Sequence, residues 1–163
     1  MPQNFTSAPE NYEIHSFVSE GPDIVVTPAE HKGRGVLHSH SFYEIVYVAE
    51  GFTLHQSCGR ITMLITGDFF FVKPGEVHSY INAYQTKLYN LLFVPAALGD
   101  SFSALSALPG LDEMFSPSGE SLDPTHRLLH VSIGERRNIE SALEKMIGER
   151  ENKNVGWEVS LKA

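Results

Sequence analysis

The fold is decided by one short stretch of sequence, His38-Ser39-His40-Ser41-Phe42-Tyr43-Glu44. Gly51 follows seven residues after the glutamate. Side chains alternate between the two faces of a β-strand, so residues two apart in sequence point the same way. If the strand stays regular, His38, His40 and Glu44 therefore share one face. Imidazole and carboxylate groups gathered on one face are ligands that suit divalent transition metals.

A second run of ligand-type residues lies further along the chain: Gly67-Asp68, then Pro74-Gly75-Glu76-Val77-His78, then Asn82. A nitrogen from His78 would complete a set of three histidines and one carboxylate. The sequence therefore predicts a metal site formed by His38, His40, Glu44 and His78. Zinc, nickel, manganese and iron remain equally open as the metal.

The two runs resemble the two motifs of the cupin family. The first cupin motif is matched in full from His38 to Gly51. In the second motif, the family spacing is met at four positions: Gly67, Gly75, His78 and Asn82. The resemblance implies a mainly β fold, the cupin double-stranded β-helix or jelly-roll barrel, followed here by C-terminal α-helices.

The stretch from His38 to Pro95 is also similar to the sensor domain of arabinose-regulator-type (AraC/XylS) transcription factors. The resemblance is carried by the following residues: His38, His40, Tyr43, Glu44, Gly67, Asp68, Phe69, Pro74, Gly75 and His78. It implies a ligand-sensing and dimerisation domain in which a small molecule, such as a sugar, enters the barrel. The paired helix-turn-helix units that bind DNA in that family are not in this chain.

Composition points to one globular domain and away from nucleic acid. The chain has 163 residues, 42% of them hydrophobic and 20% charged, which is ordinary for a soluble protein. The formal net charge of −8 disfavours contact with a phosphate backbone, so DNA binding would need another segment of the protein. No signal peptide or membrane span is recognisable, which predicts a cytoplasmic location.

The distribution of polar and apolar residues along the sequence divides it into three segments. Residues 1 to 10 are polar and predict a flexible N-terminal arm. Residues 11 to 95 contain short apolar or alternating runs separated by turn signals, which predict the barrel. Residues 96 to 163 show helical spacing and predict a helical segment used for packing or dimerisation. No stop signal ends the final helical pattern at Ala163, so we expect this segment to continue in a longer protein.

The helix expected over residues 134 to 150 carries an apolar stripe formed by Ile139, Leu143, Met146 and Ile147. The stripe fits packing against the chain's own barrel. The family resemblance favours a dimer interface instead, with Trp157 as a further contact. Both readings remain open at this point.

A pocket is expected beside the histidines. Phe42 lies between His40 and Glu44 with the same parity and predicts an apolar wall. Tyr80 and Asn82 share the parity of His78 and are predicted to contact a ligand. His55 is expected on an exposed hairpin. Without a metal, the same residues would form a polar pocket floor, in which Glu44 must accept hydrogen bonds or take up a proton.

Two functions therefore compete. The first is the sensing domain of a bacterial regulator, which binds a small-molecule effector, pairs as a homodimer in the full-length protein and repositions attached DNA-binding domains. It involves no catalysis and no membrane. The alternative is a metal-dependent cupin enzyme, a dioxygenase or a sugar isomerase, because three histidines and a carboxylate leave positions on an octahedral ion open to substrate.

Overall fold

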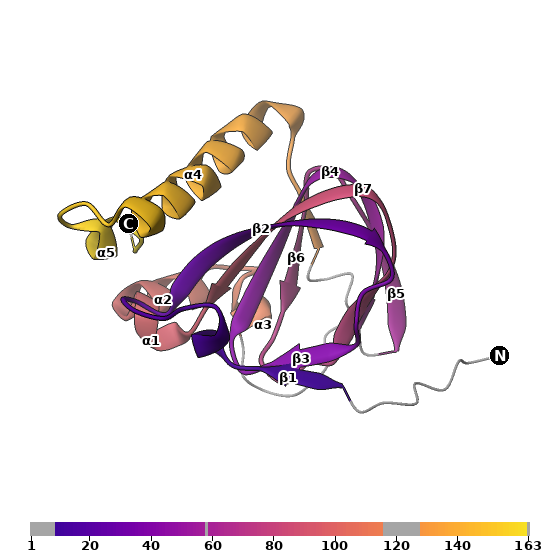
Figure 1. Cartoon of the computed structure of the whole chain (residues 1–163), viewed down its shortest axis with the longest axis horizontal. Coiled ribbons are helices and arrows are strands. Elements are labelled where there is room, and N and C mark those ends of the chain that lie inside the picture. The colour runs from indigo at the N-terminus through magenta and orange to yellow at the C-terminus, as the bar shows by residue number, and fades with distance from the viewer. Residues whose placement is uncertain (1–8, 58, 116–127, 163) are drawn as a thin grey trace.

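The computed structural model describes residues 9–57, 59–115 and 128–162, and shows a β-barrel with helices on its outside (Figure 1). The strands are β1 (Glu10–Tyr12), β2 (Ile24–Gly33), β3 (His38–His40), β4 (Tyr43–Ser57), β5 (Arg60–Ile65), β6 (Asp68–Val72), β7 (His78–Phe93) and β8 (Leu128–His130). The helices are η1 (Ile14–Ser16, a 3₁₀ turn), α1 (Pro95–Leu98), α2 (Asp100–Ser106), α3 (Asp112–Phe115), α4 (Ile133–Asn152) and α5 (Trp157–Ser160). Most of the predicted arm, residues 1 to 8, lies outside the described residues.

The barrel is organised around the two long strands β4 and β7, which pair antiparallel along their whole lengths. On its other side β7 pairs with β2 and, at His78, with β3. The other side of β4 is shared by β6 and β5. Strands β4 and β7 are far longer than ordinary strands, and they bend at the register shifts between them, which curls the sheet into a barrel.

Alternation along β4 separates two cores. Glu44, Val46 and Val48 face the barrel interior, and the two valines pack there with residues from three other strands: Leu64, Phe70, Val72, Tyr80 and Leu88. Tyr43 and Tyr47 face outward and are buried beneath the helices. A strand buried on both faces explains why the segment from Tyr43 to Val48 reads as an almost continuous apolar run.

The motif glycine at position 51 has a backbone role. Its φ of +76° lies in the left-handed region, and a Cβ there would approach the carbonyl oxygens of Gln85 and Tyr84 to 2.3 and 2.5 Å. The pairing of β4 with β7 shifts register on both sides of this glycine. Gly51 therefore permits the bend that turns the C-terminal end of β4 around the barrel.

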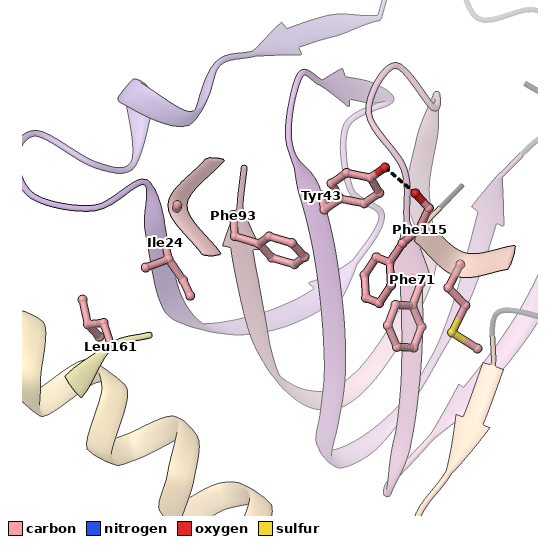
Figure 2. Close-up of a cluster of buried hydrophobic side chains, with 8 residues drawn as sticks. Ile24, Tyr43, Phe71, Phe93, Phe115 and Leu161 are labelled. Atoms are coloured by element: carbon pink, nitrogen blue, oxygen red, sulfur yellow. Dashed lines mark hydrogen bonds between the residues drawn. The ribbon is translucent and has the colours of Figure 1, made fainter. Parts of the chain in front are cut away.

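The short helices α1, α2 and α3 cover the outer face of the sheet, as the helical spacing after Pro95 predicted. Figure 2 shows Phe93, Tyr43 and Phe71 from three strands packed with Phe115 of α3. The Tyr43 hydroxyl donates a hydrogen bond of 3.0 Å to the Phe115 carbonyl. This aromatic cluster fixes the helical segment to strands that also carry the interior site.

Helix α4 lies along the outside of the barrel and begins one residue before the expected start. Leu143 is buried against Val26, Tyr47 and Tyr89. The two tyrosine hydroxyls donate hydrogen bonds to α4, Tyr47 to Glu140 at 3.0 Å and Tyr89 to Glu144 at 3.3 Å. In the described part of the chain, no helix is both long and apolar enough to cross a membrane.

One strand lies where the sequence predicted only helices. Strand β8 falls within residues 96 to 163 but pairs antiparallel with β6, so the barrel draws a strand from beyond residue 95. Its three residues are too few to show a period-2 pattern, which is why alternation did not reveal it. His130 of β8 also contacts Asp68 of the second motif, with 2.6 Å between His130 Nδ1 and Asp68 Oδ1.

Candidate functional site: a His–Glu cluster in the barrel

Three strands bring the predicted ligand residues together inside the barrel. His38 and His40 come from β3, Glu44 from β4 and His78 from β7, where His78 lies opposite His38 in the sheet register. One ligand atom from each of His38, Glu44 and His78 lies within 4.8 Å of the others. His40 is outside that group of three but places its Nε2 atom 3.0 Å from Glu44 Oε2.

The backbone orients all three imidazole rings in the same way. The Nδ1 atoms of His38, His40 and His78 lie 2.9, 2.8 and 3.1 Å from the carbonyl oxygens of Val36, Phe42 and Glu76. A carbonyl can only accept, so each Nδ1 carries the hydrogen, and Nε2 of a neutral ring bears the lone pair. This is the arrangement that presents Nε2 to a metal, with a second partner fixing the tautomer.

The cluster is deeply buried and electrostatically coupled. Burial alone would raise the pKa of Glu44, but the His40 ring at hydrogen-bond distance and the nearby His78 ring lower it below its usual range. Burial works against a charged His78, yet the neighbouring Glu44 carboxylate raises the pKa of this imidazole. Burial and the proximity of His78 lower the pKa of His38, which favours its neutral form.

These residues fit a divalent transition metal. Nε2 of His78 is buried 3.3 Å from Glu44 Oε2 without meeting a hydrogen-bond partner of suitable geometry among the described residues. Nitrogen lone pairs turned toward a buried carboxylate repel it unless a cation, either protons or a metal, lies between them. His38, Glu44 and His78 would hold the ion, with His40 beside them, and the ion would act as a Lewis acid toward an oxygen of a bound molecule.

A pocket of about 330 Å³ opens directly above this cluster. Its walls come from β1, β2, β3, β4 and β7 and from the segment around η1. The lining residues are Tyr12, Phe17, Thr27, His31, Gly35, Val36, His38, His40, Phe42, Glu44, Tyr80, Asn90 and Leu92. The volume suits a small molecule, and the mixture of apolar walls with a few polar groups is typical of ligand pockets.

Two of the predicted pocket residues line this cavity and one does not. Phe42 stacks on His40 with 4.3 Å between ring centroids, and Tyr80 is buried in the wall. Asn82 is exposed on the opposite face. The cause is a register shift between Leu54 and His55 of β4, where β7 carries one extra residue between Tyr80 and Asn82. This bulge reverses the parity that the prediction assumed.

Sequence reasoning missed three residues in and around the site. His31 of β2 lies against Tyr80 with 4.7 Å between ring centroids, and Asn90 lines the same pocket. His55, expected on an exposed hairpin, is instead 1% exposed, with its ring centroid 5.4 Å from that of His78. No motif marks these positions, and the register shifts between β4 and β7 hide the alternation around His55 from the sequence.

The residues predicted for dimerisation lie against their own barrel. Leu143 is buried, and Ile139, Met146 and Ile147 pack around it. The Arg150 guanidinium lies over the Trp157 ring, with its Cζ atom 5.5 Å from the ring centroid. The same ring fills the space beside Gly21. Intramolecular packing thus accounts for the stripe in this structure, and dimerisation through these residues stays a prediction.

The chain is similar in sequence to bacterial transcriptional activators. The chain is 29% identical over 114 residues to the HTH-type transcriptional activator RhaR of Klebsiella pneumoniae, covering 70% of this chain and 38% of that protein. RhaR of Escherichia coli O139:H28 is also 29% identical, over 107 residues, covering 66% and 36%. The chain therefore spans well under half the length of these relatives.

Among solved structures, the chain is similar to an RmlC-like cupin from Shewanella frigidimarina, with 28% identity, a TM-score of 0.40 and coverage of 42% of this chain and 64% of that one. A cupin 2 conserved barrel domain protein from Salinispora arenicola matches at 21% identity and a TM-score of 0.42, covering 64% and 78%. The fold is, as expected, a mainly β barrel followed by α-helices. The family model described as AraC-like ligand binding domain matches residues 21–147, and the chain belongs to that family.

Proposed function

We propose that this chain is the effector-sensing and dimerisation domain of a bacterial AraC-type transcription regulator. The observation that carries the proposal is the pocket of about 330 Å³ above the His–Glu cluster, in a chain of the AraC-like ligand-binding family. The similar RhaR proteins are HTH-type transcriptional activators, which supports a sensing role over a catalytic one.

The effector is a small polar molecule, and a sugar is the class that the pocket favours. The Tyr80 hydroxyl and Asn90 Oδ1 are buried, and within the described residues neither meets a hydrogen-bond partner. Burial raises the pKa of Tyr80 well above its ordinary value, so the phenol keeps its proton and can donate. A ligand with several hydroxyl groups would satisfy both atoms, whereas an apolar ligand would leave them unpaired.

A divalent transition metal, zinc, nickel, manganese or iron, is proposed as the cofactor at His38, His40, Glu44 and His78. The ion would lie at the floor of the pocket and contribute to effector binding. DNA would be bound by a separate part of the longer protein, because this chain carries a formal net charge of −8. Effector binding would regulate transcription by favouring one arrangement of a homodimer over another.

A metal-dependent cupin enzyme, a dioxygenase or sugar isomerase, is the second candidate. It is favoured by the same cluster, because a metal held by these residues would have coordination positions left for a substrate. The two functions make different predictions for a bound molecule. A sensor releases its effector unchanged, whereas an enzyme releases a product.

The test is a thermal-shift screen of the 163-residue chain against sugars, sugar acids, small carboxylates and aromatic acids, with and without each metal. A molecule that raises the melting temperature is then measured by calorimetry and incubated with the metal-loaded protein under air, and the mixture is analysed by NMR. We expect saturable binding and unchanged ligand. Turnover of the ligand would contradict the sensor proposal and establish the enzyme.

A further inference from the structure

The outer surface of the barrel has an apolar area on β5 and its neighbours. Ile61, Met63 and Ile65 alternate with inward-facing residues along β5 and point outward, and Phe52 of β4 and Tyr84 of β7 lie beside them. These five side chains, which we call the β5 patch, are between 40% and 62% exposed. The outer face of an antiparallel sheet normally carries polar side chains, so this patch calls for an explanation.

The members of the β5 patch are neighbours across three strands. Ile65 lies opposite Phe52, and Phe52 lies opposite Tyr84. The two aromatic rings stack with 5.6 Å between centroids and 24° between planes. Met63 and Ile61 continue the surface along β5, where Met63 lies opposite Leu54. The patch is therefore one continuous surface and not a set of scattered apolar side chains.

The area of the β5 patch matches what a protein contact requires. Five large side chains at these exposures present on the order of 500 Å² of mostly apolar surface, at the upper end of the range for the largest patch on a monomer. Two copies that cover each other's patch would bury about 1,000 Å² from these side chains alone, near the lower limit for a specific interface. Polar residues around the patch would add to that area.

The charges around the β5 patch fit a second copy of this chain. A shallow hollow beside Phe52 and Tyr84 is lined by two acids and two bases, Glu30, Glu50, Lys32 and Lys87. Lys87 lies opposite both Glu30 and Glu50 in the sheet register. The chain as a whole carries −8, so two copies repel each other over most of their surfaces. Around this hollow the two acids and two lysines cancel in charge, so two copies meet here without net repulsion, and acids of one copy can face lysines of the other.

We propose that the β5 patch is a two-fold symmetric contact between two copies of this chain. A two-fold contact places the same patch on both sides, so a surface that is apolar at its centre and charge-balanced at its rim complements itself. Figure 1 shows β5 on the side of the barrel away from α4 and α5. The contact therefore leaves the helices free and is independent of effector binding and of pairing through α4.

Sedimentation velocity over a range of concentrations up to about 100 µM tests the contact. The wild-type chain is expected to dimerise. Met63→Lys on β5 and Tyr84→Glu on β7 each place a charge in the centre of the β5 patch and are expected to raise the dimer dissociation constant at least about 100-fold. Val159→Lys changes an apolar residue on α5 that is 73% exposed and lies outside the β5 patch, and this control is expected to dimerise as the wild type does.

A wild-type chain that stays monomeric at all these concentrations overturns the proposal. So does an association that neither patch variant weakens, because its contact must then lie elsewhere. Circular dichroism and the melting temperature confirm that each variant is folded. Met63 and Tyr84 lie outside the core on different strands, so if one variant fails to fold, the other decides the question. Metal or effector binding by the patch variants is expected to be unchanged, which keeps this test separate from that of the sensing function.

Discussion

Nε2 of His78 lies 3.3 Å from Oε2 of Glu44, buried in the barrel without a hydrogen bond of suitable geometry between them. The same oxygen is 3.0 Å from Nε2 of His40. Because backbone carbonyls hold the Nδ1 atoms of both rings, the Nε2 atoms and the carboxylate oxygen are left to share a cation. The cluster can satisfy this need with protons or with a metal, and these two states predict different behaviour.

Replacement of His78 should remove metal binding. With His78→Ala, metal content measured by elemental mass spectrometry is expected to fall from near one equivalent to the background level. His40→Ala is expected to weaken binding by about 10- to 100-fold without abolishing it, because His40 contacts Glu44 from outside the group of three. Equal loss in both variants would show that His40 is a full ligand, as the sequence alone suggested.

The control for this measurement is His15→Ala, which removes an exposed histidine on η1 that belongs neither to the cluster nor to the pocket lining. It should keep the wild-type metal content and affinity. Loss of metal in this variant as well would mean that surface histidines account for the binding, and the interior site would lose its support.

In the metal-free protein, the Glu44–His78 pair should stabilise the fold most at mildly acidic pH. Glu44 has a lowered pKa in the folded protein, so its contribution is present above the ordinary value of 4.5 and is lost as the pH falls through the folded value. His78 has a raised pKa, so its contribution is complete below 6.5 and is lost as the pH rises through the folded value. The contribution of the Glu44–His78 pair to the free energy of unfolding in EDTA should therefore peak between pH 4.5 and 6.5.

Chemical unfolding from pH 4 to pH 9 measures this profile. The decline above the peak should disappear in His78→Asn, while His15→Asn keeps the wild-type shape. Saturating metal should reverse the trend, since protons compete with the ion for the histidines and binding strengthens as pH rises. A metal-free profile that is the same in wild type and His78→Asn would refute the proposed coupling.

The sequence predicted the interior cluster because its four residues lie close to regular strand ends. His38 and His40 lie on β3, and Glu44 lies two residues into β4 on the same face of the sheet. The alternation of side chains expected from His38 to Glu44 is therefore seen in the structure. The spacing of the second motif placed His78 opposite His38. These relationships depend on local geometry, which a strand pattern describes well.

Alternation failed where strands bulge. Along β4 the inward side chains are at even positions from Glu44 to Val48 but at odd positions from Thr53 onward, because the register shifts around Gly51. His55 therefore turns inward, and the extra residue on β7 turns Asn82 outward. A bulge depends on pairing with a distant strand, so local sequence gives little warning of it. The sequence also left open whether Leu143 packs on its own barrel or at a dimer interface. Only the tertiary structure shows that it packs on the barrel.

Leu143→Ala should destabilise the isolated domain. The side chain is buried between α4 and the barrel, so its truncation leaves a cavity that costs about 2–4 kcal/mol of unfolding free energy. Chemical unfolding measures the loss, and hydrogen exchange along α4 should accelerate. Ser141→Ala, on the exposed side of the same helix, should change stability by no more than about 0.5 kcal/mol. A small loss that depends on protein concentration would instead identify Leu143 as a dimer contact.

Tyr80→Phe should separate stability from effector binding. The Tyr80 hydroxyl is buried, and among the described residues it has no hydrogen-bond partner, so its removal relieves a desolvated polar group. The ligand-free variant should be as stable as the wild type, or more stable by up to about 1 kcal/mol. A hydroxylated effector that uses this group should bind about 10-fold or more weakly, because a hydrogen bond in the pocket is lost.

Calorimetry with the effector found by screening, together with unfolding of the ligand-free protein, measures both quantities. Tyr84→Phe is the matched control, because Tyr84 lies on the same strand but is exposed on the outer face. It should leave both quantities unchanged. If Tyr80→Phe destabilised the ligand-free protein by more than about 1 kcal/mol, its hydroxyl would have a structural partner, and its assignment to the effector would be wrong. Unchanged effector affinity would instead show that the ligand binds in the pocket without contacting Tyr80.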